Sequence, residues 1–155
     1  MNLNFYHMLK IGDKMPDFEV VDQDGNQVSS KDLIGKKTVV YFYPKDNTSG
    51  CTAEACSIRD NYESLVAKGY NVIGVSKDSA ASHRKFREKY DLPFTLLSDT
   101  STQMLQAFGA WGEKKMYGKT VMGTIRRTFI FDEEGILTRI IENVDTKNHA
   151  AQILD

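Results

Sequence analysis

The sequence predicts an α/β fold in which a central mixed β-sheet is flanked by helices and preceded by an N-terminal β-hairpin extension. From residue 38 onward, runs of β-branched and aromatic residues alternate with segments of helical periodicity. That order favours parallel strands joined by helical crossovers. A hairpin pattern precedes this alternation and a second one follows it, and hairpins add antiparallel strands. Together these observations predict a mixed sheet.

The first predicted elements form the N-terminal hairpin. Residues 18–22 are expected to be a short strand, Asp24-Gly25 gives a turn signal, and residues 27–28 form the return strand. One helical turn is expected over residues 30–34. Residues 1–9 are expected to be an ill-ordered extension.

The next segment predicts a central strand, a polar loop and a long helix. Residues 39–43 are β-branched and aromatic, which is typical of a strand buried on both faces. Pro44 ends this strand because it has no N–H for the ladder. Residues 45–50 are polar and form a loop. Helical spacing then runs over residues 52–68, and Gly69 is expected just past the helix end.

The remainder of the chain continues the alternation of strands and helices. The predicted elements are a strand over 71–76, a helix that Ser79 caps and that runs to about Tyr90, a strand over 94–97, a helix over 100–108, strands over 126–132 and 137–142, and a C-terminal helix over 149–154. The strand at 39–43 and the strand at 71–76 are expected to be parallel neighbours.

Composition restricts the classes of function. The 20 basic residues nearly balance the 21 acidic ones, giving a net charge of −1, so no nucleic acid or anionic membrane partner is expected. No run of 18 or more apolar residues is present, and the N-terminus lacks a secretory signal pattern. Two cysteines at a reactive spacing suit a reducing compartment. We therefore expect one cytoplasmic domain over residues 1–155.

Both cysteines lie in one segment, and the first lies where a helix begins. Cys51 follows the polar loop, and Thr48 or Ser49 can cap the helix that starts beside it. The unpaired N–H groups and the positive end of the helix dipole favour a negative charge at this position. They therefore favour the thiolate, which is the nucleophilic form of cysteine. The alternative is that one or both cysteines are buried apolar residues.

Cys56 follows five residues later, and helical geometry keeps the two cysteines apart. Five residues advance a helix by ~7.5 Å and leave the side chains ~140° apart. The Cα atoms are then ~8–9 Å apart, beyond the ~7 Å limit for a disulfide. A Cys51–Cys56 bond would therefore require the first helical turns to unwind.

These residues resemble the peroxiredoxins, whose signature is Pro-x-x-x-Thr-x-x-Cys. Pro44, Thr48 and Cys51 match it, and the bacterioferritin comigratory protein or Q-type group is similar in having a second cysteine at the position of Cys56. Ser49 departs from the pattern, since many relatives have Pro there. The likeness extends from about residue 10 to the C-terminus. The further matching segments are residues 43–48, Arg59-Asp60, residues 94–99 and residues 108–114.

The resemblance implies a thioredoxin-like fold and a thioredoxin-dependent peroxidase. Such an enzyme reduces hydrogen peroxide and organic hydroperoxides to water and alcohols, in antioxidant defence. The resemblance implies no cofactor and no metal. Its partners would be a hydroperoxide and thioredoxin or a similar dithiol. The oligomeric state that it implies is a monomer, with a weak dimer as the alternative.

The resemblance also assigns roles to individual residues. Cys51 would be the peroxidatic cysteine and Cys56 the resolving cysteine. The Thr48 hydroxyl would orient the peroxide, and Pro44 would shield the pocket from water. Arg126 would supply the positive charge that stabilises the thiolate and the leaving oxygen.

Arg127 is the second candidate for that arginine. Because successive residues of a strand point to opposite faces, only one of Arg126 and Arg127 can reach Cys51.

Other interpretations remain open at this stage. A thiol–disulfide oxidoreductase is a second hypothesis, although the chain lacks the C-x-x-C motif, and a redox-sensing or chaperone-like binding module is a third. A protease-like Cys–His pair would need one of His7, His83 or His149 beside Cys51. The three histidines are scattered without metal-ligand spacing, and His83 is expected at the surface.

Three further features have two interpretations each. Glu54 either complements the helix dipole or ties down the arginine. Trp111, Met116 and Tyr117 either wall the active site or pack within a loop. The acidic residues 132–134, followed by Gly135, are better explained by a hairpin turn than by a cation site.

Overall fold

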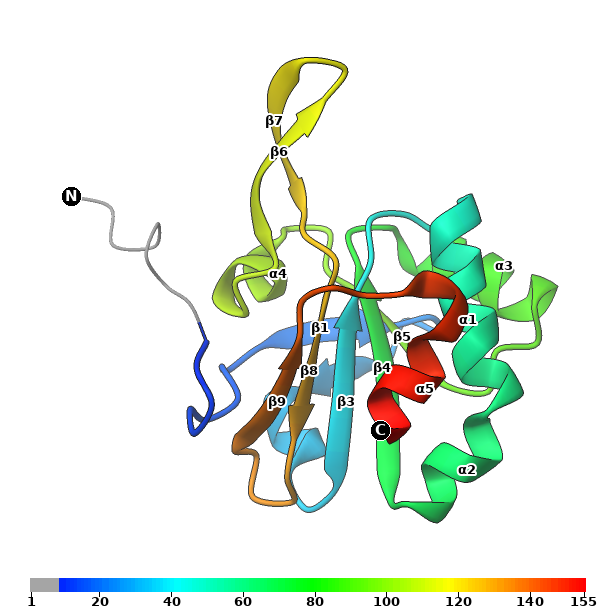
Figure 1. Ribbon diagram of the computed structural model, residues 1–155, viewed down its shortest axis with the longest axis vertical. Helices are drawn as coiled ribbons and strands as arrows, with labels where there is room; N and C mark the ends of the chain where they lie inside the picture. The colour runs from blue at the N-terminus through cyan, green and yellow to red at the C-terminus, as the bar shows by residue number, and fades with distance from the viewer. Residues whose placement is uncertain (1–8) are drawn as a thin grey trace.

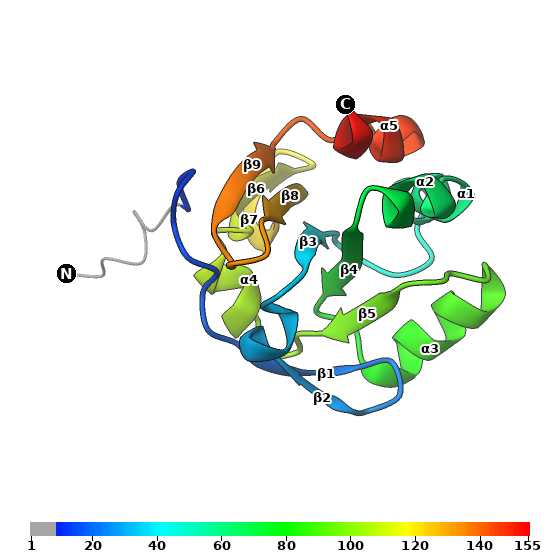
Figure 2. The ribbon, with the colours of Figure 1, turned by 90° about the horizontal axis from the view of Figure 1, so that it is seen from below.

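A seven-stranded mixed sheet forms the centre of the molecule (Figures 1 and 2). The computed structural model describes residues 9–155. Strands β3, β4 and β5 are parallel, whereas β1, β8 and β9 join the sheet as antiparallel neighbours. The order across the sheet is β2 (Gln27–Ser29), β1 (Glu19–Asp22), β5 (Thr95–Ser98), β4 (Tyr70–Ser76), β3 (Lys37–Phe42), β8 (Arg127–Phe131) and β9 (Leu137–Ile141). The predicted mixed sheet, N-terminal hairpin and parallel β3–β4 unit are confirmed.

The two faces of the sheet carry separate apolar cores. Val39, Tyr41 and Tyr43 point to one face, and Val40 and Phe42 point to the other, so β3 is buried on both. The first face is covered by α1 (Ser49–Asp60), α2 (Tyr62–Ala67), α3 (Ala80–Lys89) and α5 (His149–Leu154), and the second by α4 (Gln103–Ala107) (Figure 2). Two short 3-10 helices are η2 (Ser30–Leu33) and η3 (Thr146–Asn148).

The long helix predicted over residues 52–68 is two helices in the structure. The first starts earlier, at Ser49, and ends before Asn61, where φ is −119° and ψ is 18°. The Asn61 side-chain amide donates to the Ser57 carbonyl at 2.9 Å, a local bond that competes with regular helix geometry. Gly69 follows α2 with φ +85°, as the sequence predicts.

The strands β6 (Trp111–Met116) and β7 (Lys119–Thr124) form a hairpin that projects from the body of the molecule (Figure 1). The sequence does not predict this hairpin, because its strands are largely polar and lack a period-two apolar pattern. Trp111 packs against the core, but Tyr117 lies at the tip and is 98% exposed. Neither open interpretation of this segment holds for Tyr117, since so exposed a side chain neither walls a pocket nor packs in a loop.

The acidic segment of residues 132–135 forms a turn, as the sequence predicts. Gly135 closes the hairpin between β8 and β9, with φ +79° and a 3.0 Å bond from its N–H to the Asp132 carbonyl, so the acidic segment is a turn.

Most of the predicted N-terminal extension lies outside the described residues, but Leu9 is buried in the core and does not belong to an extension. Among residues 9–155, no helix is long and apolar enough to cross a membrane.

Gly74 offers a test of how tightly β4 packs against its neighbours. A Cβ at this position would lie 2.8 Å from Tyr41 Cζ and 2.9 Å from Leu96 Cδ2. We expect Gly74→Ala to lower the free energy of unfolding by about 2 kcal/mol, measured by urea denaturation. Gly123→Ala is the matched control, because a Cβ there meets only the flexible Lys114 side chain, at 3.2 Å. Equal urea midpoints for the two variants would contradict this packing.

Candidate active site

The start of α1 determines the surroundings of Cys51. Because this helix begins at Ser49, Cys51 is its third residue, and the Thr52 N–H is the first to bond within the helix, to the Thr48 carbonyl at 2.8 Å. The N–H groups of residues 49–51 therefore have no acceptor in the helix. They and the helix dipole give this end a partial positive charge. The Cys51 side chain is 1% exposed, so little water screens that charge.

Arg126 connects the thiol to a buried carboxyl group. Its Nη2 donates to Cys51 Sγ at 3.3 Å, and its Nη1 donates to Glu54 Oε1 at 2.5 Å. Burial lowers the pKa of Arg126, but the neighbouring Glu54 and Cys51 raise it by more, so the guanidinium stays charged. A permanent cation in contact with sulfur favours the thiolate.

The two candidate arginines point in different directions, as strand alternation predicts. Arg127 donates from Nη1 to the Gly109 carbonyl at 2.8 Å, and its Nη2 lies 3.9 Å from the Glu142 carboxylate. Arg126 is therefore the arginine that contacts Cys51.

Glu54 is fully buried one turn after Cys51. Burial raises the pKa of Glu54 to about 7, although the Arg126 guanidinium acts to lower it. The second carboxyl oxygen, Oε2, has no hydrogen-bond partner and lies 3.5 Å from His149 Nε2. An unbonded, buried oxygen makes the charged form costly. Of the two interpretations of Glu54, the structure supports the one in which Glu54 holds the arginine, because Glu54 accepts a hydrogen bond from Arg126.

His149 lies beside the Glu54 carboxyl group, and its own ring nitrogens are bonded to other residues. Its Nδ1 lies 2.8 Å from Gln152 Oε1, and its Nε2 lies 2.7 Å from the Thr128 hydroxyl. Because an amide oxygen only accepts, Nδ1 carries the hydrogen and Nε2 accepts from Thr128. Burial lowers the pKa of His149, which keeps it neutral. No spacing in the sequence brings Glu54 and His149 together, so sequence reasoning missed this contact.

Cys56 lies in the same unbroken helix as Cys51, and both cysteines are free thiols. Their spacing within α1 keeps them beyond the reach of a disulfide. Beyond Cys56 the helix is held in place, because the Ser57 hydroxyl accepts from the Ala150 N–H of α5 at 3.1 Å.

Thr48 and Pro44 lie in the loop between β3 and α1. Thr48 occupies the N-cap position, but its hydroxyl makes no capping bond and instead donates to the Lys45 carbonyl at 2.9 Å. Its side chain is exposed, and Pro44 is half-buried at the start of the loop. The roles of these two residues toward a substrate stay predictions.

The prediction that His83 lies at the surface is wrong. Its side chain is fully buried, and its Nδ1 lies 2.7 Å from the Asp46 carboxylate of the same loop. The charged residues around it in α3 face solvent, so composition alone suggested an exposed helix. His83 also does not form a protease-like pair, because its ring nitrogens are bonded to Asp46 and to the Leu97 carbonyl.

Comparison with known proteins gives a consistent result. The model of the AhpC/TSA family matches residues 11–140. Peroxiredoxin Bcp of Bacillus subtilis is 46% identical, over 94% of this chain and 93% of that protein. Among solved structures, a cysteine-to-serine variant of Xylella fastidiosa PrxQ has a TM-score of 0.88 at 30% identity, over 96% of this chain and 94% of its own. The Xanthomonas campestris bacterioferritin comigratory protein, studied for alkyl peroxide reduction, has a TM-score of 0.83 at 34% identity, over 88% and 87%.

The raised pKa of Glu54 predicts a pH dependence of stability. Between the ordinary value of 4.5 and about 7, the folded state holds a proton that the unfolded state has released. The contribution of Glu54 to the free energy of unfolding therefore falls as pH rises through this range, by about 3 kcal/mol, and is constant above it. Glu54→Gln is expected to remove this fall when urea unfolding is compared at pH 5 and pH 7.5. The exposed Glu63→Gln is the control, and an unchanged pH dependence in Glu54→Gln would contradict the shift.

Proposed function

The chain belongs to the AhpC/TSA family and, within it, to the peroxiredoxins of the Bcp type, and on that premise we propose that Cys51 is the residue that attacks the peroxide. The protein is a thiol peroxidase, an oxidoreductase that reduces hydroperoxides through a cysteine. The observation that carries the residue assignment is the 3.3 Å contact between Arg126 Nη2 and Cys51 Sγ at the start of a helix.

In the first step the Cys51 thiolate attacks one oxygen of the hydroperoxide. The O–O bond breaks, a sulfenic acid forms on sulfur, and the other oxygen leaves as hydroxide or alkoxide, which takes a proton from water. Before the attack, Arg126 stabilises the negative charge on sulfur. During the attack, it stabilises the negative charge that develops on the leaving oxygen. Because the guanidinium is already held by Glu54, little reorganisation is needed when that charge develops.

The loop and the first turn of α1 orient the substrate. The N–H groups of residues 49–51 and the Thr48 hydroxyl offer hydrogen bonds to a peroxide placed in line with sulfur. Pro44, half-buried beside them, limits access of water. Ser49 stands where many relatives have Pro, and it continues the helix start without changing the reacting groups.

In the second step Cys56 resolves the sulfenic acid. Its thiol displaces the hydroxyl group as water and forms a Cys51–Cys56 disulfide. The two residues share one helix, so the segment from Ser49 to Cys56 must unwind first. Thioredoxin or a similar dithiol then reduces the disulfide by exchange.

The remaining assignments complete the proposal. The substrates are hydrogen peroxide and organic hydroperoxides, in keeping with the alkyl peroxide reduction for which the Xanthomonas relative was studied. The protein acts as a cytoplasmic, single-domain monomer over residues 1–155, in cell redox homeostasis and antioxidant defence. Thiol–disulfide exchange without a peroxide and redox sensing without turnover are less well supported, because the named relatives are peroxiredoxins.

Cysteine variants test the two chemical steps separately. Cys51→Ser is expected to abolish peroxide consumption coupled to thioredoxin and its reductase, because no nucleophile remains. Cys56→Ser is expected to permit one oxidation and then stop at the sulfenic acid. Mass spectrometry after peroxide treatment of the unaltered protein should find the Cys51–Cys56 bond. Turnover by Cys51→Ser would remove Cys51 from the mechanism, and absence of the bond would refute the intramolecular step.

Arginine variants test the electrostatic argument. Arg126→Ala is expected to slow the reaction of Cys51 with peroxide by about 100-fold or more, since it removes a donor to the developing oxyanion. Arg126→Lys keeps the charge but not the two-point contact and should be intermediate. Arg127→Ala is the control and should have a much smaller effect. Stopped-flow kinetics measures all three, and a larger loss in Arg127→Ala would show that the wrong arginine was assigned.

A further inference from the structure

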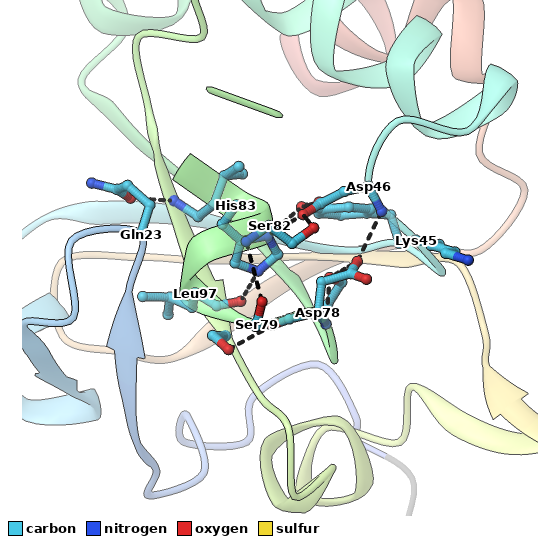
Figure 3. A network of polar contacts seen from close by, with 12 residues as sticks. Gln23, Lys45, Asp46, Asp78, Ser79, Ser82, His83 and Leu97 are labelled. Carbon is cyan, nitrogen blue, oxygen red and sulfur yellow. Dashed lines mark hydrogen bonds and ion pairs between the residues drawn. The ribbon is translucent and has the colours of Figure 1, made fainter. Parts of the chain in front are cut away.

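A buried polar network fastens the loop between β3 and α1 to α3 (Figure 3). Its central residue is Asp46, which lies between Pro44 and Thr48 in the sequence and is only 7% exposed. Asp46 Oδ1 accepts from the Tyr43 hydroxyl at 2.6 Å, and Oδ2 accepts from the Ser82 hydroxyl at 2.8 Å. The loop is therefore held to α3 through the Asp46 side chain.

His83 completes this network with a fixed direction. Its Nε2 lies 2.9 Å from the Leu97 carbonyl, which only accepts, so Nε2 carries a hydrogen. Its Nδ1 lies 2.7 Å from Asp46 Oδ2, so one proton is held between the ring and the carboxyl group. The imidazole thereby connects the loop to strand β5 in one orientation.

The backbone of the loop is fixed at the same place. The Asp46 N–H donates to Asp78 Oδ2 at 2.8 Å, and the Ser76 hydroxyl donates to the same oxygen at 2.7 Å. One residue later, Asn47 Oδ1 accepts from the Tyr90 hydroxyl at 3.0 Å. Asn47 has φ +60°, a left-handed conformation that asparagine adopts more readily than most residues.

The same atoms do not make a cation site. One ligand atom from each of Asp46, Asp78 and His83 lies within 4.8 Å of the other two, a grouping that resembles a metal site. However, both Asp46 oxygens, Asp78 Oδ2 and both His83 nitrogens are engaged in the bonds described above. An internally satisfied network of this kind fixes geometry.

Stability alone does not explain such a group. Replacing a buried ionic pair by apolar side chains of similar volume is often neutral or stabilising. The Asp46–His83 pair instead provides a hydrogen bond of fixed direction, and that bond holds the loop that carries Pro44 and Thr48. Misplacement of substrate-binding groups by about 1 Å can cost about 100-fold in rate.

We propose that His83 is a positioning residue for the peroxidase reaction, which through Asp46 holds the loop from Pro44 to Thr48 in the geometry that receives the hydroperoxide. This inference rests on the proposed function. It assigns to α3, which contributes no reacting group, the task of fixing the substrate side of the site.

Two conservative variants separate the two bonds of the imidazole. His83→Asn places an amide nitrogen near the position of Nδ1 and keeps a donor toward Asp46. His83→Gln places its amide near Nε2 and keeps the bond to Leu97 but not the one to Asp46. We expect His83→Gln to slow oxidation of Cys51 by hydrogen peroxide at least about 10-fold, and His83→Asn to stay near the unaltered protein.

A second readout separates positioning from a merely structural role. Alkylation of Cys51 by iodoacetamide needs the thiolate but no oriented peroxide, so its rate should change by less than about twofold in both variants. Both rates are measured in a Cys56→Ser background in single turnover. Leu137→Ala, a buried change on the far strand β9, is the control for lowered stability and should leave both rates unchanged.

The outcomes are distinct. The inference is overturned if peroxide oxidises His83→Gln as fast as the unaltered protein. It is also overturned if oxidation and alkylation slow to the same extent in His83→Gln. If His83→Gln does not fold, Ser82→Ala is used instead, because it removes another donor to Asp46. This variant should also lose peroxide oxidation without losing alkylation, and unchanged oxidation would equally overturn the inference. Failure of the unaltered protein to react with peroxide would instead overturn the proposed function itself, and this inference with it.

Discussion

The partly buried Arg126 guanidinium lies between a buried thiol and a buried carboxyl group, and the rest of the site depends on that placement. A cation that loses part of its hydration is costly unless it is paired. Glu54 supplies the pairing, and in doing so orients the second nitrogen toward sulfur. The antiparallel register of β3 and β8, which sets Phe42 opposite Arg127, places the preceding arginine beside the end of β3 where the active-site loop begins. Strand pairing therefore determines the chemistry available to Cys51.

In the mechanism proposed above, helix α1 has to satisfy two opposed requirements. While it is intact, its first turn presents unbonded N–H groups near Cys51 and keeps Cys56 away, which suits attack on a peroxide. Disulfide formation needs the same turns to unwind. The Ser57 hydroxyl ties the helix to α5 just beyond Cys56, the loop before Ser49 is tied to α3, and Glu54 ties the turns between them to Arg126. The segment that the proposed Cys51–Cys56 disulfide would unwind lies between the first two of these attachments and contains the third.

Two buried contacts between a carboxyl group and an imidazole lie on either side of Cys51. Asp46 with His83 precedes it, and Glu54 with His149 follows it. The first is a hydrogen bond that joins the loop to α3, whereas the second is a 3.5 Å approach without a hydrogen bond, between α1 and a residue distant in the sequence. Buried polar groups of this kind add little net stability compared with apolar packing, but they specify one arrangement of the chain. The site is thus kept rigid around the thiol by polar contacts, whereas the apolar cores on both faces of the sheet supply most of the stability.

The local pattern of the sequence determined the mixed sheet, the doubly buried strand before Pro44 and the position of Cys51 at a helix start, because these follow from residue periodicity and turn chemistry over a few neighbours. The family resemblance implied Arg126 as the arginine, with Arg127 as the second candidate, and strand alternation predicted that only one of the two would reach the thiol. Only the tertiary structure decided that this one is Arg126, that Glu54 and His149 lie together, and that His83 is buried beneath the loop. Those contacts join residues 37 to 95 positions apart, and such distant pairing depends on sheet register and helix packing, which no local pattern encodes.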